Sequence, residues 1–224
     1  GSAFFTCPNL QTVTFQGNVE ELGGAIFYHT PVTKVTLSDD MTHIGDKMFL
    51  RCDKLTDINW PSKLEVIGVA AFNDCKLLPS VTLPASLKEI GDEAFLNCNK
   101  ISSVAFPASL EKLGSCAFSK TSLKTITLDA NNRNFRLAGD ELYSNDYRLL
   151  YLVPMKGKTT VKTMGACVGI NGGAFWGSEV ENVTLSKKVI AIDNFAFCQS
   201  ALKSINLPNT LVFIGEQAFA STQL

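Results

Sequence analysis

Residues 78–98 read LPSVTLPASLKEIGDEAFLNC, and the same pattern returns when the chain is shifted by 23 residues. The Gly-x-x-Ala-Phe segment at 91–95 then aligns with GVAAF at 68–72 and with GSCAF at 114–118. Internal similarity at a fixed period is the sequence signature of repeat architectures. The 224-residue chain is therefore predicted to be an array of short repeats.

One phenylalanine marks the same place in every repeat. Successive members of this set are 22 or 23 residues apart, except for one interval of 57 residues. No single repeat can bury its own apolar side chains, but a neighbour on each side can complete the burial. We therefore expect these phenylalanines to stack as one continuous column, which we call the spine. The nine positions are Phe4, Phe27, Phe49, Phe72, Phe95, Phe118, Phe175, Phe197 and Phe219.

Each repeat has two halves that predict different local structures. The first half, LxxVxL at 78–83, alternates apolar and polar residues as a half-buried strand does. A proline, which cannot donate to a strand ladder, follows directly in several repeats, as Pro84 does here. The second half, with Leu87 and Ile90, predicts a short second strand and then a helical turn. The expected fold is a repeat solenoid, a right-handed superhelix with a parallel concave β-sheet, short second strands and helical turns.

A corner residue lies four positions before most spine phenylalanines. Six of these corners are glycine, and the other two are asparagine and aspartate. These residue types tolerate positive φ better than others do. We therefore predict a left-handed backbone at every corner. The corner positions are Gly23, Gly45, Gly68, Gly91, Gly114, Asn171, Asp193 and Gly215.

The 57-residue interval contains an irregular repeat at residues 129–160. Asn145-Asp146 is a turn signal between two apolar runs, so a β-hairpin insertion is predicted there. Insertions in solenoids map to loops on one face, which is often the binding face. Residues 1–224 as a whole are predicted to form a single domain of about nine to ten repeats.

Composition and charge exclude several classes of protein. With 46% hydrophobic and 18% charged residues, the chain is typical of a folded domain rather than of a disordered one. The net charge is −1 and the lysines and arginines are scattered, so nucleic acid is not an expected partner. No segment approaches the roughly 20 apolar residues of a membrane-spanning helix, and residues 1–5 lack the features of a signal peptide. We therefore expect no membrane insertion by this segment.

The pattern LxxVxLPxSLxxIGxxAFxxC at 78–98 resembles the BspA-like leucine-rich repeats of bacterial cell-surface proteins, which also occur in some parasitic protists. The resemblance covers essentially the whole chain in at least nine copies. The irregular repeat resembles a long variant that this family intersperses among regular repeats. The resemblance implies a leucine-rich repeat solenoid that is secreted or at the cell surface. It further implies a role in adhesion to host proteins or in cell contact, with no shared catalytic residues.

The seven cysteines are an odd number, and four of them lie three residues after a spine phenylalanine. A metal site formed by Cys52, Cys75 and Cys98 is disfavoured, because side chains stacked about 4.8 Å apart in a line do not surround a tetrahedral ion. Disulfides are disfavoured as well, since their Cβ atoms lie about 3.8 Å apart. Other repeats have threonine or serine at this place. We predict buried free thiols and neither a metal nor a cofactor.

No catalytic constellation is evident. His29 and His43 are the only histidines, and neither has a cysteine or serine at a recognised spacing. Gly172-Gly173 is not followed by the Lys-Ser/Thr of a phosphate-binding loop. Paired acids for glycoside hydrolysis stay open, although nothing singles out one pair. The prediction is a protein that is not an enzyme.

Two groups of residues are candidates for contact with a partner. The first group lies on the solvent side of the predicted concave sheet and comprises Lys34, Thr36, Asp57 and Asn59. The second group lies in the irregular repeat and supplies the aromatic and guanidinium groups that interfaces favour. Its members are Arg133, Arg136, Tyr143, Tyr147, Arg148 and Tyr151. Two alternatives stay open: the threonines simply suit an exposed sheet, and Tyr143 replaces a spine phenylalanine while the hairpin packs on its own repeat.

The expected function is that of an extracellular module for protein binding or adhesion. Its partner would be a host matrix or serum protein, or a surface protein of another cell, and the module is expected to be monomeric. A glycan is the alternative ligand, because flat rows of Ser, Thr and Asn can hydrogen-bond to sugars. A third hypothesis is a spacer region that binds nothing itself and separates other domains of a larger surface protein.

Overall fold

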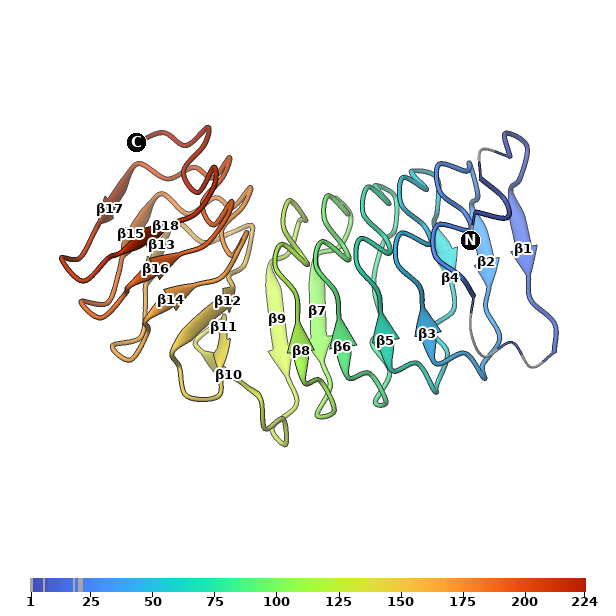
Figure 1. Cartoon of the computed structure of the whole chain (residues 1–224), viewed down its shortest axis with the longest axis horizontal. Helices are drawn as coiled ribbons and strands as arrows, with labels where there is room; N and C mark the ends of the chain where they lie inside the picture. The colour runs from blue at the N-terminus through green and yellow to red at the C-terminus, as the bar shows by residue number, and fades with distance from the viewer. Residues whose placement is uncertain (1, 6, 18, 20–21) are drawn as a thin grey trace.

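The computed structural model describes residues 2–5, 7–17, 19 and 22–224, which form a solenoid of stacked coils (Figure 1). A regular coil contains a first strand, a second strand and a turn that carries the spine phenylalanine. Successive coils pair in parallel and in register, as Val104 does with Ile126. The predicted repeat solenoid is confirmed. The expected helical turns are hydrogen-bonded turns instead, since the described residues contain no helix.

The first strands form three separate parallel sheets, β1-β2-β4, β7-β9 and β13-β15-β17. Their bounds are β1 (Thr12–Thr14), β2 (Lys34–Thr36), β4 (Asp57–Ile58), β7 (Ser103–Phe106), β9 (Thr125–Leu128), β13 (Thr160–Lys162), β15 (Asn182–Thr184) and β17 (Ser204–Asn206). The second strands are two residues long because a turn follows at once. Their bounds are β3 (His43–Ile44), β5 (Val66–Ile67), β6 (Glu89–Ile90), β8 (Lys112–Leu113), β14 (Gly169–Ile170), β16 (Ala191–Ile192) and β18 (Phe213–Ile214).

The row of first strands breaks at residues 78–83, where the repeat pattern predicts a strand and the structure has none. In a neighbouring coil, the second residue of the LxxVxL segment donates its N–H to the coil before it, as Lys124 N does to Ser102 O at 2.8 Å. Pro79 occupies the same position and has no N–H. The prediction of a strand here was wrong because side-chain alternation does not report the backbone donor that proline removes.

The spine is present as two runs of stacked rings. Neighbouring ring centroids lie 5.0 to 5.3 Å apart along Phe4–Phe118, and 4.5 and 5.2 Å apart along Phe175–Phe219. Between the runs, Val153 takes the spine position, since its N–H donates to Ala174 O as Phe197 N does to the residue before the next spine phenylalanine. The expected unbroken column of rings is therefore corrected to an apolar column with one aliphatic member.

The left-handed backbone predicted at the corner residues, Asn171 and Asp193 included, was wrong. No corner residue has positive φ; the residue two positions later does, as at Ala70 (φ 52°). The corner glycines are needed because adjacent coils approach closely there. A Cβ atom on Gly91 would lie 2.7 Å from Val69 N, which is closer than real Cβ atoms come to backbone. Lack of a side chain, rather than freedom of φ, explains these glycines.

The irregular repeat forms an antiparallel unit of three strands, β10 (Phe135–Ala138), β11 (Glu141–Ser144) and β12 (Leu149–Leu152). β12 also pairs in parallel with β14 of the next coil. The unit thereby joins the second strands of the C-terminal coils in one sheet, in the order β10-β11-β12-β14-β16-β18. In Figure 1 it lies between the green N-terminal coils and the orange C-terminal coils.

The turns of the solenoid bypass the irregular repeat. Cys116 N donates to Gly172 O at 2.8 Å, the bond that elsewhere joins successive regular coils. Gly173 permits this contact, because its φ is 67° and a Cβ atom there would lie 2.7 Å from Cys116 Sγ. We call this contact the seam. It gives Gly172-Gly173 a packing role.

Three buried thiols lie one above another beside the spine. Cys52, Cys75 and Cys98 each donate to the carbonyl oxygen of a spine phenylalanine in the preceding coil, at 3.0, 3.1 and 3.1 Å. Burial raises the pKa of each thiol, and that of Cys52 reaches about 11. All seven cysteines are free, and six are buried. The predicted buried free thiols are therefore present, and their hydrogen bonds explain why threonine or serine can stand in the same place.

Candidate functional site

The solvent side of the first strands is an exposed polar surface, which we call the strand face. Along β7, Ser103 and Ala105 are exposed while Val104 and Phe106 are buried. Other first strands show the same alternation, and their parallel register aligns the exposed side chains in rows along the solenoid. The strand face comprises Thr12, Thr14, Lys34, Thr36, Asp57, Asn59, Ser103, Ala105, Thr125, Thr127, Thr160, Lys162, Asn182, Thr184, Ser204 and Asn206.

Lys34 and Asp57 form an ion pair on this face. Lys34 Nζ lies 2.7 Å from Asp57 Oδ2, and more than half of each side chain is exposed. Exposed pairs of this kind contribute about 1 kcal/mol or less to stability, so both groups can exchange each other for a partner. Thr36 follows on the same strand and is half-buried.

Asn59 has a structural task that the sequence did not reveal. Its Oδ1 accepts from Leu37 N at 2.7 Å and its Nδ2 donates to Leu37 O at 3.0 Å. Asn206 makes the same pair of bonds with Leu185 two repeats from the C-terminal end. The recurrence of asparagine as the second residue after the buried strand residue was the available signal. Both amides link neighbouring coils where the first strands end.

Tyr143 of the irregular repeat is fully buried. Its hydroxyl oxygen accepts from Met164 N at 3.3 Å, and burial raises the pKa of this phenol. The side chain packs in the C-terminal apolar cluster with Leu150 and Val153. It therefore offers no surface to a partner in this structure.

Arg136 and Tyr151 are half-buried within the same repeat. The Arg136 guanidinium donates to Asn132 O at 2.7 Å and to Phe135 O at 3.3 Å. The Tyr151 ring meets the Phe135 ring edge-on at 5.2 Å, and burial raises the pKa of the Tyr151 phenol. Both side chains hold the shape of the inserted strands.

Arg133 and Arg148 are the exposed members of the second group, and Tyr147 is partly exposed beside them in sequence. Arg148 Nε lies 3.9 Å from Asp146 Oδ2, with both side chains well exposed. Figure 1 shows β2, which carries Lys34, near the N-terminal end and β10–β12 past the middle. The structure thus keeps the two predicted groups apart along the solenoid.

A charged cluster that sequence reasoning missed fixes the tip of the β10–β11 hairpin. Lys158 Nζ lies 2.7 Å from Glu141 Oε1 and also pairs with Asp140. The side chain of Glu141 is 11% exposed and that of Lys158 is 22% exposed. Hydrogen bonds to the two carboxylates outweigh burial and raise the pKa of Lys158. Only the fold brings these residues together, since 17 or 18 positions separate them in sequence.

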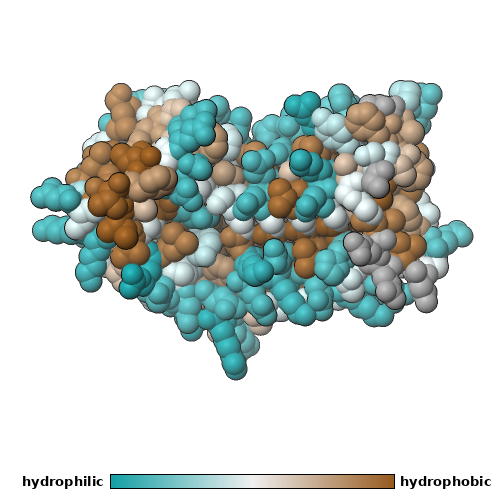
Figure 2. Space-filling model, in the orientation of Figure 1, coloured by the Kyte–Doolittle hydropathy of each residue, from teal (hydrophilic) through white to brown (hydrophobic). Residues whose placement is uncertain are grey.

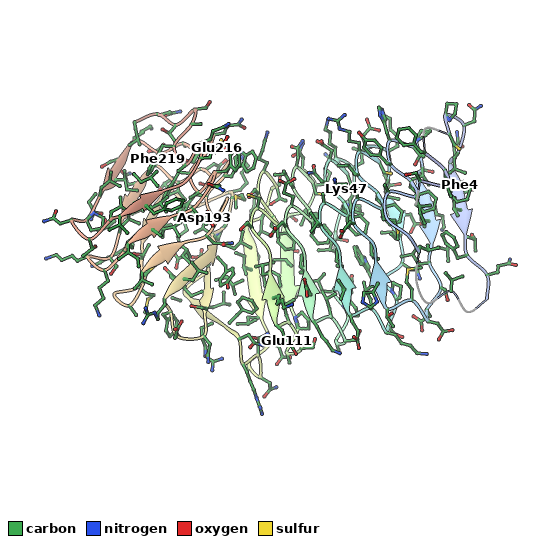
Figure 3. All side chains as sticks on the ribbon, in the orientation of Figure 1. Phe4, Lys47, Glu111, Asp193, Glu216 and Phe219 are labelled. Atoms are coloured by element: carbon green, nitrogen blue, oxygen red, sulfur yellow. The ribbon has the colours of Figure 1, made fainter. Side chains whose placement is uncertain are left out.

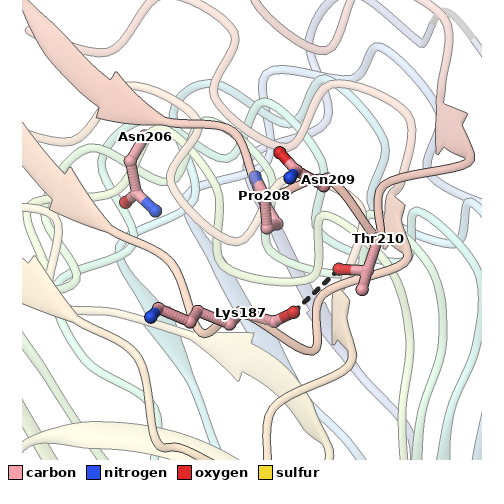
Figure 4. Close-up of a pocket in the computed structure, with 5 residues that line it drawn as sticks. All are labelled: Lys187, Asn206, Pro208, Asn209 and Thr210. Atoms are coloured by element: carbon pink, nitrogen blue, oxygen red, sulfur yellow. Dashed lines mark hydrogen bonds between the residues drawn. The ribbon is translucent and has the colours of Figure 1, made fainter.

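The described surface has shallow hollows near the ends of the first strands. One of about 390 Å³ is lined by Lys187, Asn206, Pro208, Asn209 and Thr210 (Figure 4). Another of about 370 Å³ lies over the ends of β7 and β9, with Leu83, Ala105 and Leu128 among its lining residues. Such hollows suit single side chains or sugar rings rather than a large cofactor.

Apolar side chains are exposed at the C-terminal end of the solenoid, where Figure 2 shows a brown patch. Val212 is 83% exposed and Phe213 is 50% exposed. Ile214 is 48% exposed, whereas its register partner Ile192 is fully buried by the coil that follows it. The exposure reflects the missing neighbour of a last coil.

Polar and charged surface residues also lie on the turns and lower edges of the coils. Figure 3 labels Lys47, Asp193 and Glu216 near the turns and Glu111 on the opposite edge. His43 Nδ1 lies 2.8 Å from Thr42 Oγ1, and no group of three potential metal ligands occurs in residues 2–5, 7–17, 19 and 22–224. Among the same residues, no helix has the length and apolar character needed to span a bilayer.

Solved structures with the same architecture come from bacteria. The chain aligns with the pneumococcal vaccine antigen PcpA at a TM-score of 0.68 and 23% identity, over 93% of this chain and 63% of that one. A leucine-rich cell surface protein of Faecalibacterium prausnitzii gives a TM-score of 0.65 and 21% identity, over 95% and 73%. A leucine-rich repeat protein of Eubacterium ventriosum gives 0.66 and 21%, over 82% and 56%. The chain thus spans about three fifths of the length of PcpA and of the Eubacterium protein. A search of curated protein sequences gave no match.

The family comparison agrees with the repeat and its register. The family model described as "BspA type Leucine rich repeat region" matches in six copies, over residues 1–79, 66–164 and 167–224. These ranges include the spine, the corner glycines and the irregular repeat. The chain therefore belongs to the BspA-type leucine-rich repeat family.

Proposed function

We propose that this chain is an extracellular module that binds a protein of a host or of a neighbouring cell through its solenoid surface. The observation that carries the proposal is the strand face, where short polar side chains stand in register on a scaffold whose core is stacked rings. Such a surface is already ordered before binding, and so a partner does not have to order it. The bacterial surface proteins with the same fold support an extracellular location.

The strand face and the exposed part of the irregular repeat are the proposed contact regions. Lys34, Thr36 and Asp57 offer charge and hydrogen bonds, and Arg133, Tyr147 and Arg148 offer guanidinium and aromatic groups of the kind found at interface hot spots. The remaining predicted residues, Asn59, Arg136, Tyr143 and Tyr151, act by keeping these regions in shape. We further propose that the module is a monomer and has no enzymatic activity.

The test is capture of surface-exposed and matrix proteins on immobilised chain. A variant with Ser103→Arg and Thr125→Arg places two bulky cations on neighbouring strands of the strand face. Lys88→Arg together with Lys112→Arg, away from that face, is the matched control. We expect the strand-face variant to lose a captured protein by about tenfold or more while the control retains it. Equal capture by all three proteins would contradict binding through the strand face.

Glycan binding is the second candidate, and the rows of Thr, Ser and Asn side chains favour it. Hydroxyl and amide groups 4.8 Å apart along a row, roughly the strand spacing, can pair with successive sugar hydroxyls. A glycan array separates the two candidates. Strong, strand-face-dependent signals there, with no captured protein, would replace protein binding with glycan binding, and silence in both assays would favour a spacer.

A further inference from the structure

We propose that the C-terminal part of the strand face, around the hollow of Figure 4, binds an acidic segment of a protein partner. The inference rests on the proposed protein-binding function and adds the chemistry of the partner and its place of contact. It is carried by three lysines, by the absence of carboxylates around them, and by the hollow beside them.

The three lysines lie within a short distance of one another. Lys162 ends β13 and pairs in register with Thr184 of β15. Lys187 follows Thr184 by three residues, about 10 Å of extended chain, and Lys188 is next to it. All three side chains are exposed, and the structure shows no ion pair for any of them among the residues it describes. We call this group the lysine corner.

No carboxylate faces the lysine corner from its own coil or from the coils beside it. Residues 159–178, 182–192 and 203–215 contain neither aspartate nor glutamate. Glu181, which lies between two of these ranges, is engaged by Lys203 at 2.9 Å. Coils of the N-terminal half differ, because there a lysine faces an acid of the preceding coil, as Lys112 faces Glu89 at 3.0 Å. The fold thus gathers like charges that are scattered in the sequence, and such a surface attracts an oppositely charged partner.

The hollow beside the lysine corner adds an apolar contact. Lys187 forms one wall and Pro208 another, and the walls are held by hydrogen bonds. Thr210 Oγ1 donates to Lys187 O at 2.9 Å (Figure 4), and the Asn206 amide is tied to the backbone of Leu185. Leu207, next in sequence, is 50% exposed. Carboxylates of a partner can therefore pair with the lysines while an apolar side chain between them enters the hollow.

A peptide fits these features better than an anionic polysaccharide does. A polysaccharide would use the three charges but would leave the proline wall of the hollow without an apolar group. The bound segment is therefore a run of aspartate and glutamate interrupted by an apolar residue.

The experiment measures fluorescence anisotropy of a labelled peptide with six glutamates around one central leucine, titrated with the intact chain. The site variant carries Lys162→Gln, Lys187→Gln and Lys188→Gln. The control variant carries Lys47→Gln, Lys76→Gln and Lys100→Gln, which removes the same number of exposed charges elsewhere. We expect the Kd to rise about tenfold or more for the site variant, to change less than about twofold for the control, and to rise with salt.

Two outcomes would overturn the proposal. Equal weakening in both variants would show attraction by net charge alone. Binding of a heparin fragment at the same lysines, with the leucine replaceable by glycine at no loss, would assign the surface to an anionic polysaccharide.

The proposed function fails or stands separately. If the wild-type chain captures a surface protein and the site variant captures it equally well, the acidic-partner inference fails while protein binding stands. If the wild-type chain captures no protein but binds the peptide through the lysine corner, the lysine corner is confirmed and the protein-binding proposal is not.

Discussion

The residue three positions after a spine phenylalanine is a small hydrogen-bond donor in each regular coil. Thr121 Oγ1 donates to the carbonyl oxygen of its own spine phenylalanine at 2.8 Å, whereas Cys52 Sγ reaches the one in the preceding coil at 3.0 Å. Both solutions satisfy a carbonyl at the turn. The choice between sulfur and oxygen decides how the site responds to pH, because only the thiol titrates near pH 9.

Cys52→Ser should therefore change the pH dependence of stability more than stability itself. The folded state raises the pKa of the Cys52 thiol to about 11, so the thiol favours folding below pH 9 and this contribution falls as pH rises towards 11. We expect the variant to lose about 1 kcal/mol at pH 7 and to approach the wild type between pH 9 and 10.5. Urea unfolding at a series of pH values measures this, and a constant gap across that range would contradict the linkage.

Gly91→Ala should destabilise the fold by about 1–3 kcal/mol, since a methyl group has no room against the Val69 backbone. Gly165→Ala is the matched control, because nothing lies within 4 Å of a Cβ atom there. We expect the control to stay within about 0.5 kcal/mol of the wild type. The urea midpoints compare the two, and similar losses at both positions would show that a general glycine effect, rather than close approach, is at work.

At the scale of a single strand, Pro79 divides the row of first strands. Pro79→Thr supplies the missing donor and should allow the chain at 78–83 to pair with β4. The new hydrogen bond contributes about 1 kcal/mol, and removal of proline costs about as much through the unfolded chain, so the midpoint should move little. Hydrogen exchange gives the sharper reading: the amide of the substituted residue should be protected, and fast exchange there would contradict our explanation of the break.

The hairpin of β10 and β11 depends on Lys158 in the same way that a coil depends on its neighbours. Lys158→Met leaves Glu141 with little exposure and no cation, which should cost about 2 kcal/mol. Lys162→Met, on the exposed end of β13, is the control and should change stability by less than about 0.5 kcal/mol. Thermal unfolding with exchange of the Ala138 and Glu141 amides tests this. Unchanged protection of those amides would show that the apolar contacts hold the hairpin without the lysine.

At the scale of the whole molecule, the seam joins two apolar clusters, one built mainly from the coils before the irregular repeat and one from those after it. Repeat proteins are stabilised by interfaces between neighbouring units, so a weakened interface divides the cooperative unit. Gly173→Ala introduces a methyl group 2.7 Å from Cys116 Sγ. We expect it to separate unfolding of the two halves into two transitions.

Gly157→Ala is the control for the seam, because Gly157 also has positive φ (79°) but has nothing within 4 Å of a Cβ atom. It carries the backbone strain without the clash. Calorimetry should therefore show one transition for this variant and two for Gly173→Ala, with faster exchange of the Cys116 and Lys120 amides in the latter. A single transition in both variants would mean that the irregular repeat itself couples the halves.

By itself, the sequence determined the repeat, its register and the family, because burial of one side chain type at a fixed period leaves a pattern that needs no coordinates. The position of each spine phenylalanine and the in-line thiols followed from that pattern. The strand face also followed, since alternation along a strand separates the buried side chains from the exposed ones.

Only the tertiary structure decided features that depend on distance between backbones. The corner glycines were interpreted through φ, but their cause is the close approach of the next coil, as at Gly91. Val153 in the spine, the seam at Gly173 and the cluster around Lys158 all arise because the turns bypass the irregular repeat. The lysine corner belongs with them: the sequence lists its charges singly, and the stacking of coils places them side by side without a carboxylate between them.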